Sequence, residues 1–486
     1  MHDYQIIIEI LSQVLAGRNL NEAFTNGIAK ADAQINIGKV KDVSYGVLRY
    51  YYSIDAILNK LVAKKPKDQA IYIILLIAIY EIKYTKKPKF AIANDLVELS
   101  YTLTKNAQIK NFVNAIVRNY LRTSIEIEND LAAAPEFKYN FPLWWIKKIK
   151  EDYRPKSPLS SILNNIDTDT NTRANEIDRY TEISKHGSRI KSGMTGSVSM
   201  ITGSVSMITG SLPMVTEVLP PGSIYSKYEE VLLNLNQIPK INLRVNVRKT
   251  SVNDYVKELQ KSAIEYVLID SKISLTQSIS VDKIPLFAEG FVSIQDLNAQ
   301  KLIDLIKPAA GEYVLDACSA PGGKLCQILE NFDVETVGLE IDDSRLDKVR
   351  QNLTRLGLIA QLINADASGL DWWDKRQFDL VVADVPCSAS GTVKRNPDIK
   401  LHRQPSDIAN FVTTQRKIIT NLWQVLKPGG LMVYITCSIF KEENQDNIKY
   451  FSKNLPGIKV IQELKLLPTE FADGFYYCIL QKVQTL

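Results

Sequence analysis

The sequence is poor in histidine and cysteine and has no long apolar run. Three histidines give little support to a Cys/His metal site, and five cysteines in this spacing resemble neither a disulfide framework nor a zinc motif. The longest purely apolar run, residues 70–80, has about half the length of a membrane-spanning helix. The N-terminus lacks the basic stretch and apolar core of a secretory signal. We therefore expect a protein of the reducing cytoplasm with no membrane partner and no metal ion.

The net charge of +5 is small but unevenly distributed. Residues 1–122 hold 17 Lys and Arg against 10 Asp and Glu. Lysines beside Tyr and Phe suit an RNA backbone, while the alternative interpretation is a solvated surface. The basic segment on a nearly neutral remainder favours a nucleic-acid partner. Much of the excess comes from Lys60, Lys64, Lys65, Lys67, Lys83, Lys86, Lys87 and Lys89.

The length of 486 residues predicts two or three domains. Residues 1–125 are predicted to form a helical bundle, because apolar residues recur at three- and four-residue steps. Residues 126–157 are predicted to form a linker, with one amphipathic helix over 137–157. Residues 158–226 contain a seven-residue repeat rich in Gly, Ser and Thr, which predicts a disordered insertion.

The second half of the chain is predicted to mix strands and helices. Residues 227–300 indicate a small α+β unit, with strands over 243–246 and 290–294 and a helix over 252–261. Residues 301–486 alternate strands and helices, which predicts a doubly wound, mainly parallel α/β sheet of the Rossmann-like type. The expected strands are 313–317, 336–340, 361–365, 378–384 and 431–436, with a terminal pair near 463–467 and 476–482.

A glycine-rich turn, residues 316–324, follows the first of these strands. Glycines let the backbone approach a ligand closely, and the next helix begins there with its positive dipole end. Cys318 and Leu325 stand where a nucleoside triphosphatase signature requires a glycine and a hydroxyl, which excludes that class. The pattern Gly-x-Gly-x-x-Gly is also absent, which disfavours a nicotinamide dinucleotide.

Acidic residues follow the next two strands. Glu340 ends the second strand, 17 residues after Gly323, where a carboxylate can bind both hydroxyls of a ribose. Asp366 follows the third strand and could accept an adenine amino hydrogen. Each acid alone could be a strand-end cap, but the aligned set favours a site. A nucleoside without a polyphosphate fits this loop and these acids, and S-adenosylmethionine meets that description.

Two cysteines each stand at the end of a predicted buried strand. Ligands gather beyond the carboxyl ends of strands in an open parallel sheet, so Cys387 and Cys437 are expected to face one crevice. A thiolate is strongly nucleophilic near neutral pH and suits addition to an electron-poor ring carbon. Two thiols suggest that one adds and the other helps to undo the adduct, but the spacing does not distinguish them.

These motifs resemble those of RNA cytosine carbon-5 methyltransferases. The helical region, which ends with residues 112–118, resembles the NusB-like RNA-binding domain that precedes the methyltransferase in the Sun/Fmu, or RsmB-type, small-subunit ribosomal RNA enzymes. The α+β unit is correspondingly expected to be RRM-like. The resemblance covers the chain except for residues 158–226. The matching segments are 290–296, 318–324, 384–388, 395–400 and 436–438.

The resemblance implies methylation of carbon 5 of a cytosine in small-subunit ribosomal RNA. It implies that Cys437 adds to carbon 6 and that Cys387 assists release. It also implies that Asp384 holds the cytosine edge and that Lys324 orients the base. We expect a base flipped out of its stack and a protein that acts as a monomer. The residues expected to bind the cofactor are Cys318, Ser319, Ala320, Pro321, Gly322, Gly323, Lys324, Glu340, Asp366 and Asp384.

Two other functions stay open. One is methylation of a transfer RNA, which the NusB-like resemblance disfavours. The other is an RNA-binding assembly or antitermination factor with a degenerate enzyme domain, which the intact motifs disfavour. Three positions depart from the family pattern: Ser319 replaces alanine, Glu340 replaces aspartate and Leu401 replaces tryptophan. The last of these puts contacts on the substrate side in question.

Overall fold

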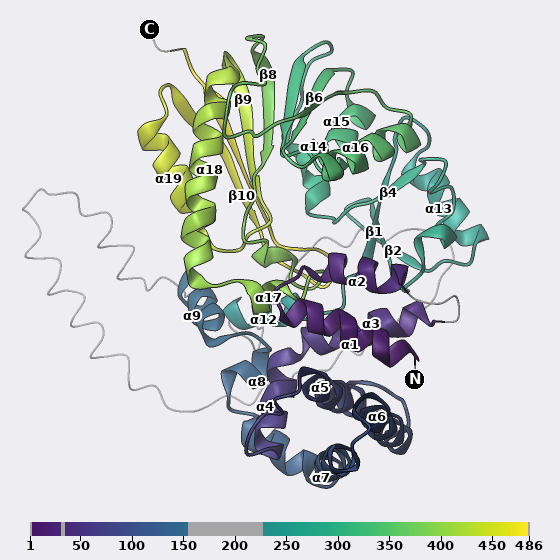
Figure 1. Cartoon of the computed structure of the whole chain (residues 1–486). Coiled ribbons are helices and arrows are strands. Elements are labelled where there is room, and N and C mark those ends of the chain that lie inside the picture. Colours follow the sequence, from purple (N-terminus) through teal and green to yellow (C-terminus); the bar gives the residue numbers. More distant parts are fainter. Residues whose placement is uncertain (1, 31–34, 154–226, 485–486) are drawn as a thin grey trace, which may run out of the picture. The chain divides into compact units, whose positions relative to one another are not determined.

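The computed structural model describes residues 2–30, 35–153 and 227–484, so the predicted insertion over 158–226 lies outside the described residues. The chain divides into two units, residues 1–152 with 219–486 and residues 153–218, and the described residues other than Tyr153 belong to the first. No helix among the described residues has the length and apolar character needed to cross a membrane. Figure 1 shows the described elements in the order of the chain.

The described residues up to Leu131 form seven helices joined by loops, in agreement with the periodicity of the sequence. Helix α5 lies at the centre of this bundle, because nearly all of its residues from Ile71 to Ile82 are buried. Asp68 begins this helix, and its carboxylate accepts hydrogen bonds from the backbone N–H groups of Ala70 and Ile71. The helices are α1 (His2–Leu15), α2 (Leu20–Ala29), α3 (Ile37–Arg49), α4 (Tyr51–Leu61), α5 (Gln69–Tyr84), α6 (Lys89–Thr104) and α7 (Ala107–Leu131).

The single helix predicted over 137–157 was wrong. Two helices occupy this stretch, α8 (Pro135–Tyr139) and α9 (Leu143–Asp152). Asn140 adopts a left-handed conformation with φ 56°, which ends α8, and Pro142 follows before α9 begins.

The α+β unit has a ferredoxin-like, antiparallel sheet with the strand order β2-β3-β1-β4. The hairpin of β2 and β3 was not predicted. Its turn residues, Asp270 and Ser271, both have positive φ, yet they lack the glycine that usually marks such a turn in a sequence. The elements are α12 (Lys227–Leu235), β1 (Ile241–Val245), α13 (Val252–Lys261), β2 (Tyr266–Ile269), β3 (Lys272–Leu275) and β4 (Val292–Ile294).

The methyltransferase-like region has a seven-stranded sheet in the order β10-β11-β9-β8-β5-β6-β7, in which β11 is antiparallel to both neighbours. The predicted Rossmann-like fold is therefore confirmed. The strands β5 and β8 agree with the prediction to the residue, and β9 begins five residues earlier than predicted. The strands are β5 (Tyr313–Ala317), β6 (Glu335–Glu340), β7 (Gln361–Asn364), β8 (Phe378–Asp384), β9 (Leu426–Thr436), β10 (Ile458–Leu466) and β11 (Phe475–Lys482).

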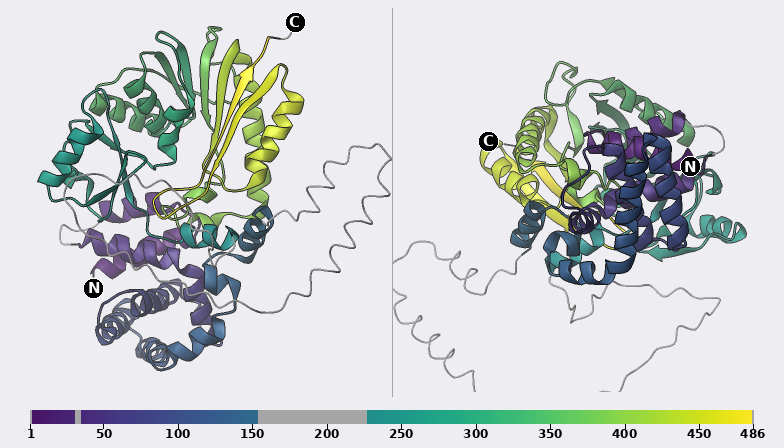
Figure 2. Two further views of the ribbon diagram at one scale, coloured as in Figure 1. Left: turned by 180° about the vertical axis from the view of Figure 1, so that it is seen from behind. Right: turned by 60° about the horizontal axis from the view of Figure 1, so that its bottom comes forward.

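Helices cover both faces of this sheet (Figures 1 and 2). One face packs against α14 (Leu302–Leu305) and α15 (Gly323–Asn331), and the other against α18 (Pro405–Val425) and α19 (Gln445–Asn454). Helix α16 (Asp343–Leu356) packs against α15. Because strand residues alternate between two covered faces, the central strands β5 and β8 are mostly apolar. Strands β5, β6, β8 and β9 are parallel, so their carboxyl ends lie at one edge of the sheet.

Leu401, one of the three departures from the family pattern, packs against the hydrophobic core of the helical bundle.

Candidate active site

The glycine-rich turn joins β5 to α15 in a conformation that glycine favours. Gly322 has φ 93° and precedes the first residue of α15. A Cβ at Gly322 would lie 3.1 Å from Cγ1 of Val349, so this turn packs closely on α16. Cys318 also has a positive φ, of 60°, at the start of the turn. Between them the backbone of residues 319–321 and the N-terminus of α15 are presented at the edge of the sheet.

Glu340, at the end of β6, binds this turn directly. Its side chain is buried, and Oε2 accepts a hydrogen bond from the N–H of Ala320 at 3.1 Å. Oε1 accepts from the N–H of Asp342 at 3.2 Å and pairs with Arg345 at 3.3 Å. Four acceptor positions on a carboxylate leave room for a further donor. Because Arg345 is half exposed, a ribose hydroxyl could take its place.

Asp366 is not joined to the turn by any such contact. It is exposed, and its carboxylate accepts from both the N–H and the Oγ of Ser368, at 2.8 and 2.6 Å. These hydrogen bonds from Ser368 hold the pKa of Asp366 below its ordinary value. Its contact with an adenine stays a prediction.

Lys324 and Asp384 form an ion pair between the turn and the end of β8. Burial disfavours the ammonium of Lys324, but the carboxylates of Asp384 and Asp316 outweigh it, so the pKa of Lys324 is raised. Burial raises the pKa of Asp316 to about 7, against the opposing effects of Lys324 and Ser319. The ammonium of Lys324 thus interacts with two carboxyl groups, that of Asp316, which is fully buried, and that of Asp384, which is partly exposed.

The two cysteines predicted to share a crevice are adjacent. The sulfur of Cys387 lies 3.4 Å from the sulfur of Cys437, close enough for one thiol to donate to the other. The hydrogen bond with Cys437 and then burial raise the pKa of Cys387 well above its ordinary value.

Backbone contacts fix the two cysteine loops. The N–H of Gly391 donates to the carbonyl oxygen of Cys437 at 2.8 Å, and the N–H of Gly474 donates to the carbonyl oxygen of Gly391 at 2.9 Å. A Cβ at Gly391 would lie only 2.3 Å from the carbonyl oxygen of Gly474. Only glycine fits at position 391, where the loop after Cys387 packs against the backbone of Cys437 and of Gly474.

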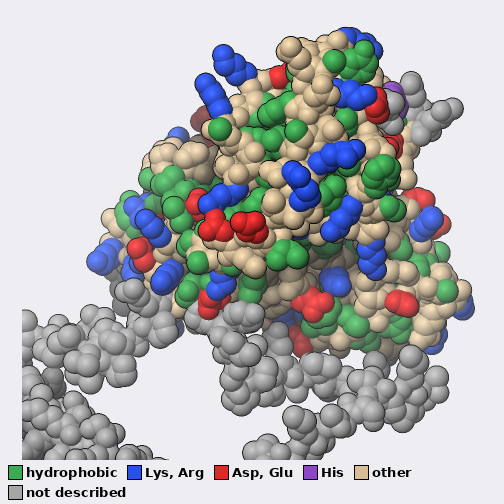
Figure 3. Space-filling view, turned by 90° about the horizontal axis from the view of Figure 1, so that it is seen from below, with side chains coloured by type: hydrophobic (Ala, Val, Ile, Leu, Met, Phe, Trp, Pro, Cys, Tyr) green, Lys and Arg blue, Asp and Glu red, His purple; other side chains and the backbone are tan. Residues whose placement is uncertain are grey.

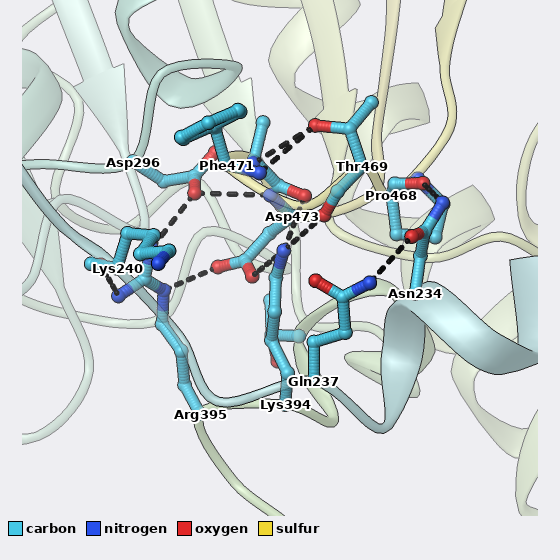
Figure 4. Close-up of polar contacts among 12 residues, drawn as sticks. Asn234, Gln237, Lys240, Asp296, Lys394, Arg395, Pro468, Thr469, Phe471 and Asp473 are labelled. Carbon is cyan, nitrogen blue, oxygen red and sulfur yellow. Dashed lines mark hydrogen bonds and ion pairs between the residues drawn. The ribbon is translucent and has the colours of Figure 1, made fainter. Parts of the chain in front are cut away.

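An ion cluster that was not predicted from the sequence holds the loop between β10 and β11, which contains Gly474 (Figure 4). Arg395 pairs with Asp473 at 2.6 Å and with Asp296 at 2.9 Å. The buried ammonium of Lys394 donates to the carbonyl oxygens of Thr469 and Ala472. The cluster therefore joins the segment after Cys387, the loop between β10 and β11, and the end of the ferredoxin-like sheet. The segment 395–400 matched the family pattern, but nothing in that pattern indicated a partner for Arg395.

A buried polar network beneath the cysteines was also not predicted. Its centre is Glu443, which accepts hydrogen bonds from Ser388 and Ser438, the residues that directly follow the two cysteines. Among the described residues there is no group of three or more His, Cys, Asp or Glu placed to hold a metal ion.

Comparisons with known proteins show the family to which this chain belongs. Family models match three stretches: the NusB family at residues 3–122, the ferredoxin-like domain of RsmF/B-like methyltransferases at 225–282, and 16S rRNA methyltransferase RsmB/F at 303–481. A ribosomal RNA small subunit methyltransferase B from Pasteurella multocida is 30% identical over 502 residues, which cover 99% of this chain and 95% of that protein. The chain belongs to the RsmB family of 16S rRNA methyltransferases.

Other relatives agree with membership of the RsmB family. The ribosomal RNA small subunit methyltransferase B of Vibrio cholerae is 29% identical over 481 residues, which cover 96% of this chain and 94% of that protein. The crystal structure of PH0851 has the same fold, with a TM-score of 0.70 and 19% identity over 99% of this chain and 98% of that one. The resemblance stated from the motifs is thereby confirmed at the level of the family.

Proposed function

We propose that this RsmB-family chain uses S-adenosylmethionine to methylate carbon 5 of a cytosine in small-subunit ribosomal RNA through a covalent adduct with Cys437. The observation that carries the proposal is the 3.4 Å approach of the Cys387 and Cys437 sulfurs, in loops that follow β8 and β9; β8 ends at Asp384, which pairs with Lys324. Methylation of a nucleophilic nitrogen or oxygen needs no second thiol. Addition to a ring carbon followed by elimination uses one thiol as nucleophile and a second to assist release.

The cofactor site of the proposal consists of the glycine-rich turn, Glu340 and Asp366. The exposed backbone at Gly322 and the first turn of α15 suit a polar ligand, and Glu340 retains an acceptor for a ribose hydroxyl. When bound, S-adenosylmethionine supplies an electrophilic methyl group.

The residues of the chain then have distinct tasks. Cys437 adds its sulfur to carbon 6 of the cytosine, and the displaced electron pair makes carbon 5 nucleophilic toward the methyl group. Asp384 holds the polar edge of the base, and Lys324 orients it through their ion pair. Loss of the carbon-5 proton to solvent water restores the ring double bond and expels Cys437 as a thiolate, and the thiol of Cys387 assists this release. Because both thiols must stay reduced, the proposal includes a cytoplasmic location, and it takes the monomer as the active form.

The helical bundle is the proposed RNA-binding surface. Lys60, Lys65, Lys83 and Lys87 pair with carboxylates, so their charge is compensated within the bundle. Lys and Arg side chains nevertheless spread over the face seen from below in Figure 3. Of the eight lysines singled out in the sequence, the other four, Lys64, Lys67, Lys86 and Lys89, are exposed and have no ion-pair partner within the described ranges. Phe90, with 70% of its surface exposed, lies beside the last of them and suits stacking on a base.

The test is a methylation assay with small-subunit ribosomal RNA, transfer RNA as a competing substrate, and position mapping of 5-methylcytosine. We expect methylation of one cytosine of the ribosomal RNA by the wild type and none by Cys437→Ala. We expect Cys387→Ala to accumulate a covalent protein–RNA species that migrates slowly in a denaturing gel. Methylation by Cys437→Ala at the wild-type rate would exclude the nucleophile, and preferential labelling of the transfer RNA would exclude the substrate.

A further inference from the structure

A single buried carboxylate binds the loops of both cysteines. Oε2 of Glu443 accepts hydrogen bonds from Oγ of Ser388 and from Oγ of Ser438, each at 2.5 Å. Oε1 accepts from the N–H of Ser388 at 2.8 Å. Ser388 directly follows Cys387, and Ser438 directly follows Cys437. The separation of the two thiols is therefore set one residue away from each, by one side chain.

The geometry points to Glu443 as a positioning residue that holds the two thiols together and, by its negative charge behind Cys387, keeps their shared proton on Cys387. This inference rests on the proposed function and deepens it, because it gives a physical reason why Cys437 is the sulfur that attacks. The family resemblance assigned the roles of Cys437 and Cys387 without giving a physical reason.

The hydrogen bonds of the network are those that an ionised carboxylate makes. Two hydroxyl donors at 2.5 Å from one oxygen match the short range of charge-assisted O–H···O⁻ bonds. The side-chain amide of Gln415 donates to Oε1 of Glu443 at 3.1 Å and to the carbonyl oxygen of Pro386 at 2.9 Å. These four hydrogen bonds, from Ser388 (two), Ser438 and Gln415, all end on the carboxylate of Glu443. The amide of Gln415 also fixes the backbone next to Cys387.

The carboxylate is buried without a cation. Glu443 is fully buried, and within the described residues no Lys, Arg or His forms an ion pair with it. Burial raises the pKa of Glu443, and the hydrogen bonds from Ser388 and Ser438 act in the opposite direction. An uncompensated buried charge is unfavourable for folding, so an acid retained at such a position indicates a functional demand.

The charges around the two sulfurs are unequal. Glu443 is one of the groups that raise the pKa of Cys387, after the hydrogen bond with Cys437 and burial. The network of Glu443 binds the loop of Cys387 through the N–H and Oγ of Ser388 and, by way of Gln415, through the carbonyl oxygen of Pro386, and it binds the loop of Cys437 through Oγ of Ser438. The guanidinium of Arg403 donates to the carbonyl oxygen of Ser388 at 3.2 Å, on the outer side of the same loop. A negative charge bound to the loop of Cys387 disfavours ionisation of that thiol, so the proton shared by the two sulfurs stays on Cys387.

The test compares Glu443→Gln with Glu442→Gln in the full chain. Gln at 443 preserves the size of the side chain and removes its charge. Glu442 is the neighbouring acid and pairs with Lys148 of α9, outside the network, so it is the matched control. We expect Glu443→Gln to lower kcat by about tenfold to a hundredfold, with the KM for RNA and for the cofactor unchanged, and Glu442→Gln to match the wild type.

A second readout reports the charge itself. Substoichiometric iodoacetamide followed by mass spectrometry measures how the label divides between Cys437 and Cys387. We expect the ratio of Cys437 to Cys387 labelling to fall by about tenfold in Glu443→Gln, equivalent to about one pKa unit of relative proton affinity. Glu443→Asp retains the charge and should keep most of this ratio even if its shorter reach slows turnover.

Three outcomes would overturn the inference: an unchanged kcat in Glu443→Gln, an unchanged labelling ratio, or a loss of activity that only parallels a loss of folding stability in urea. These outcomes are separable from failure of the proposed function. If Cys437→Ala remains active, the proposed function fails first. If Cys437→Ala is inactive while Glu443→Gln behaves as the wild type, only the role of Glu443 fails.

Discussion

Arg244 and Glu330 form a buried, two-pronged ion pair between the ferredoxin-like unit and the helix of the cofactor turn. Nε and Nη2 of Arg244 lie 2.8 Å from the two carboxylate oxygens of Glu330, on α15. The remaining nitrogen, Nη1, donates to the carbonyl oxygen of Gly323 at 2.7 Å. The β1 strand of the small unit therefore supports the first residue of α15, where the cofactor is proposed to bind.

Arg244→Ala should destabilise the chain by about 3–5 kcal/mol, because it leaves the carboxylate of Glu330 buried without its partner. Loss of the contact at Gly323 should also weaken cofactor binding. Urea unfolding and a cofactor titration measure the two effects. Arg350→Ala removes an exposed pair with Asp347 and should leave the urea midpoint unchanged. Equal midpoints for the two variants would contradict a structural role for the buried pair.

Asp316→Asn should change how stability depends on pH. Burial raises the pKa of Asp316 to about 7, whereas an unfolded aspartate titrates near about 3.9. Between about pH 4 and pH 7 the folded chain holds a proton that the unfolded chain has released, so the free energy of unfolding falls as the pH rises. The fall amounts to at most about 4 kcal/mol and levels off above the folded pKa.

The Asn variant has no group to titrate at this position, so its stability should gain on the wild type across this window. Urea midpoints taken at intervals from about pH 4 to pH 8 compare the two proteins. Parallel curves would show that Asp316 ionises with an ordinary pKa in the folded chain.

The sequence predicted the sheet better than the connections. Strands β5 and β8 are buried on both faces and are mostly apolar, so their limits were visible. The β2–β3 hairpin was missed because its strands are four residues long and its turn, Asp270-Ser271, has no glycine. The break after Tyr139 was missed because the left-handed conformation of Asn140 depends on its surroundings.

The site was predictable where a motif carried it and not where tertiary contacts did. The two thiols were expected to face one crevice because each follows the end of a buried strand of a parallel sheet. Glu443 lies in Lys441-Glu442-Glu443-Asn444, a stretch that resembles a solvated surface, and only the folded chain shows which acid is buried.

The segment 395–400 matched the family without revealing its task. In the structure the carboxylate of Asp398 accepts from the N–H of Leu20, and the ammonium of Lys400 donates to the carbonyl oxygens of Arg49 and Asn140. This segment therefore joins the helical bundle to the loop of Cys387. Such contacts link residues more than 250 positions apart, and no local pattern encodes them.

Gly391→Ala should separate the loops that carry the two thiols. The added Cβ would overlap the carbonyl oxygens of Gly474 and Cys437, at 2.3 and 2.8 Å, and backbone must move to relieve it. A displacement of about 1 Å at a reacting group lowers turnover about a hundredfold. We expect this loss in kcat, measured by methyl transfer to RNA. Gly369→Ala is the control, since its nearest atom lies 3.6 Å away, and a comparable loss there would remove the steric explanation.

Replacing Lys86 and Lys89 together by Ala should weaken RNA binding without affecting the chemical step. Both are exposed and lie beside Phe90 at the start of α6. Each lysine that contacts a phosphate releases counterions, so the slope of log K against log salt should decrease by about one per lysine. Filter binding at several salt concentrations gives the slope, and single-turnover methylation at saturating RNA should stay unchanged. Lys60→Ala removes a lysine already paired with Asp130 and should leave the slope as it is. An unaltered slope in the double variant would place the RNA on another face of the bundle.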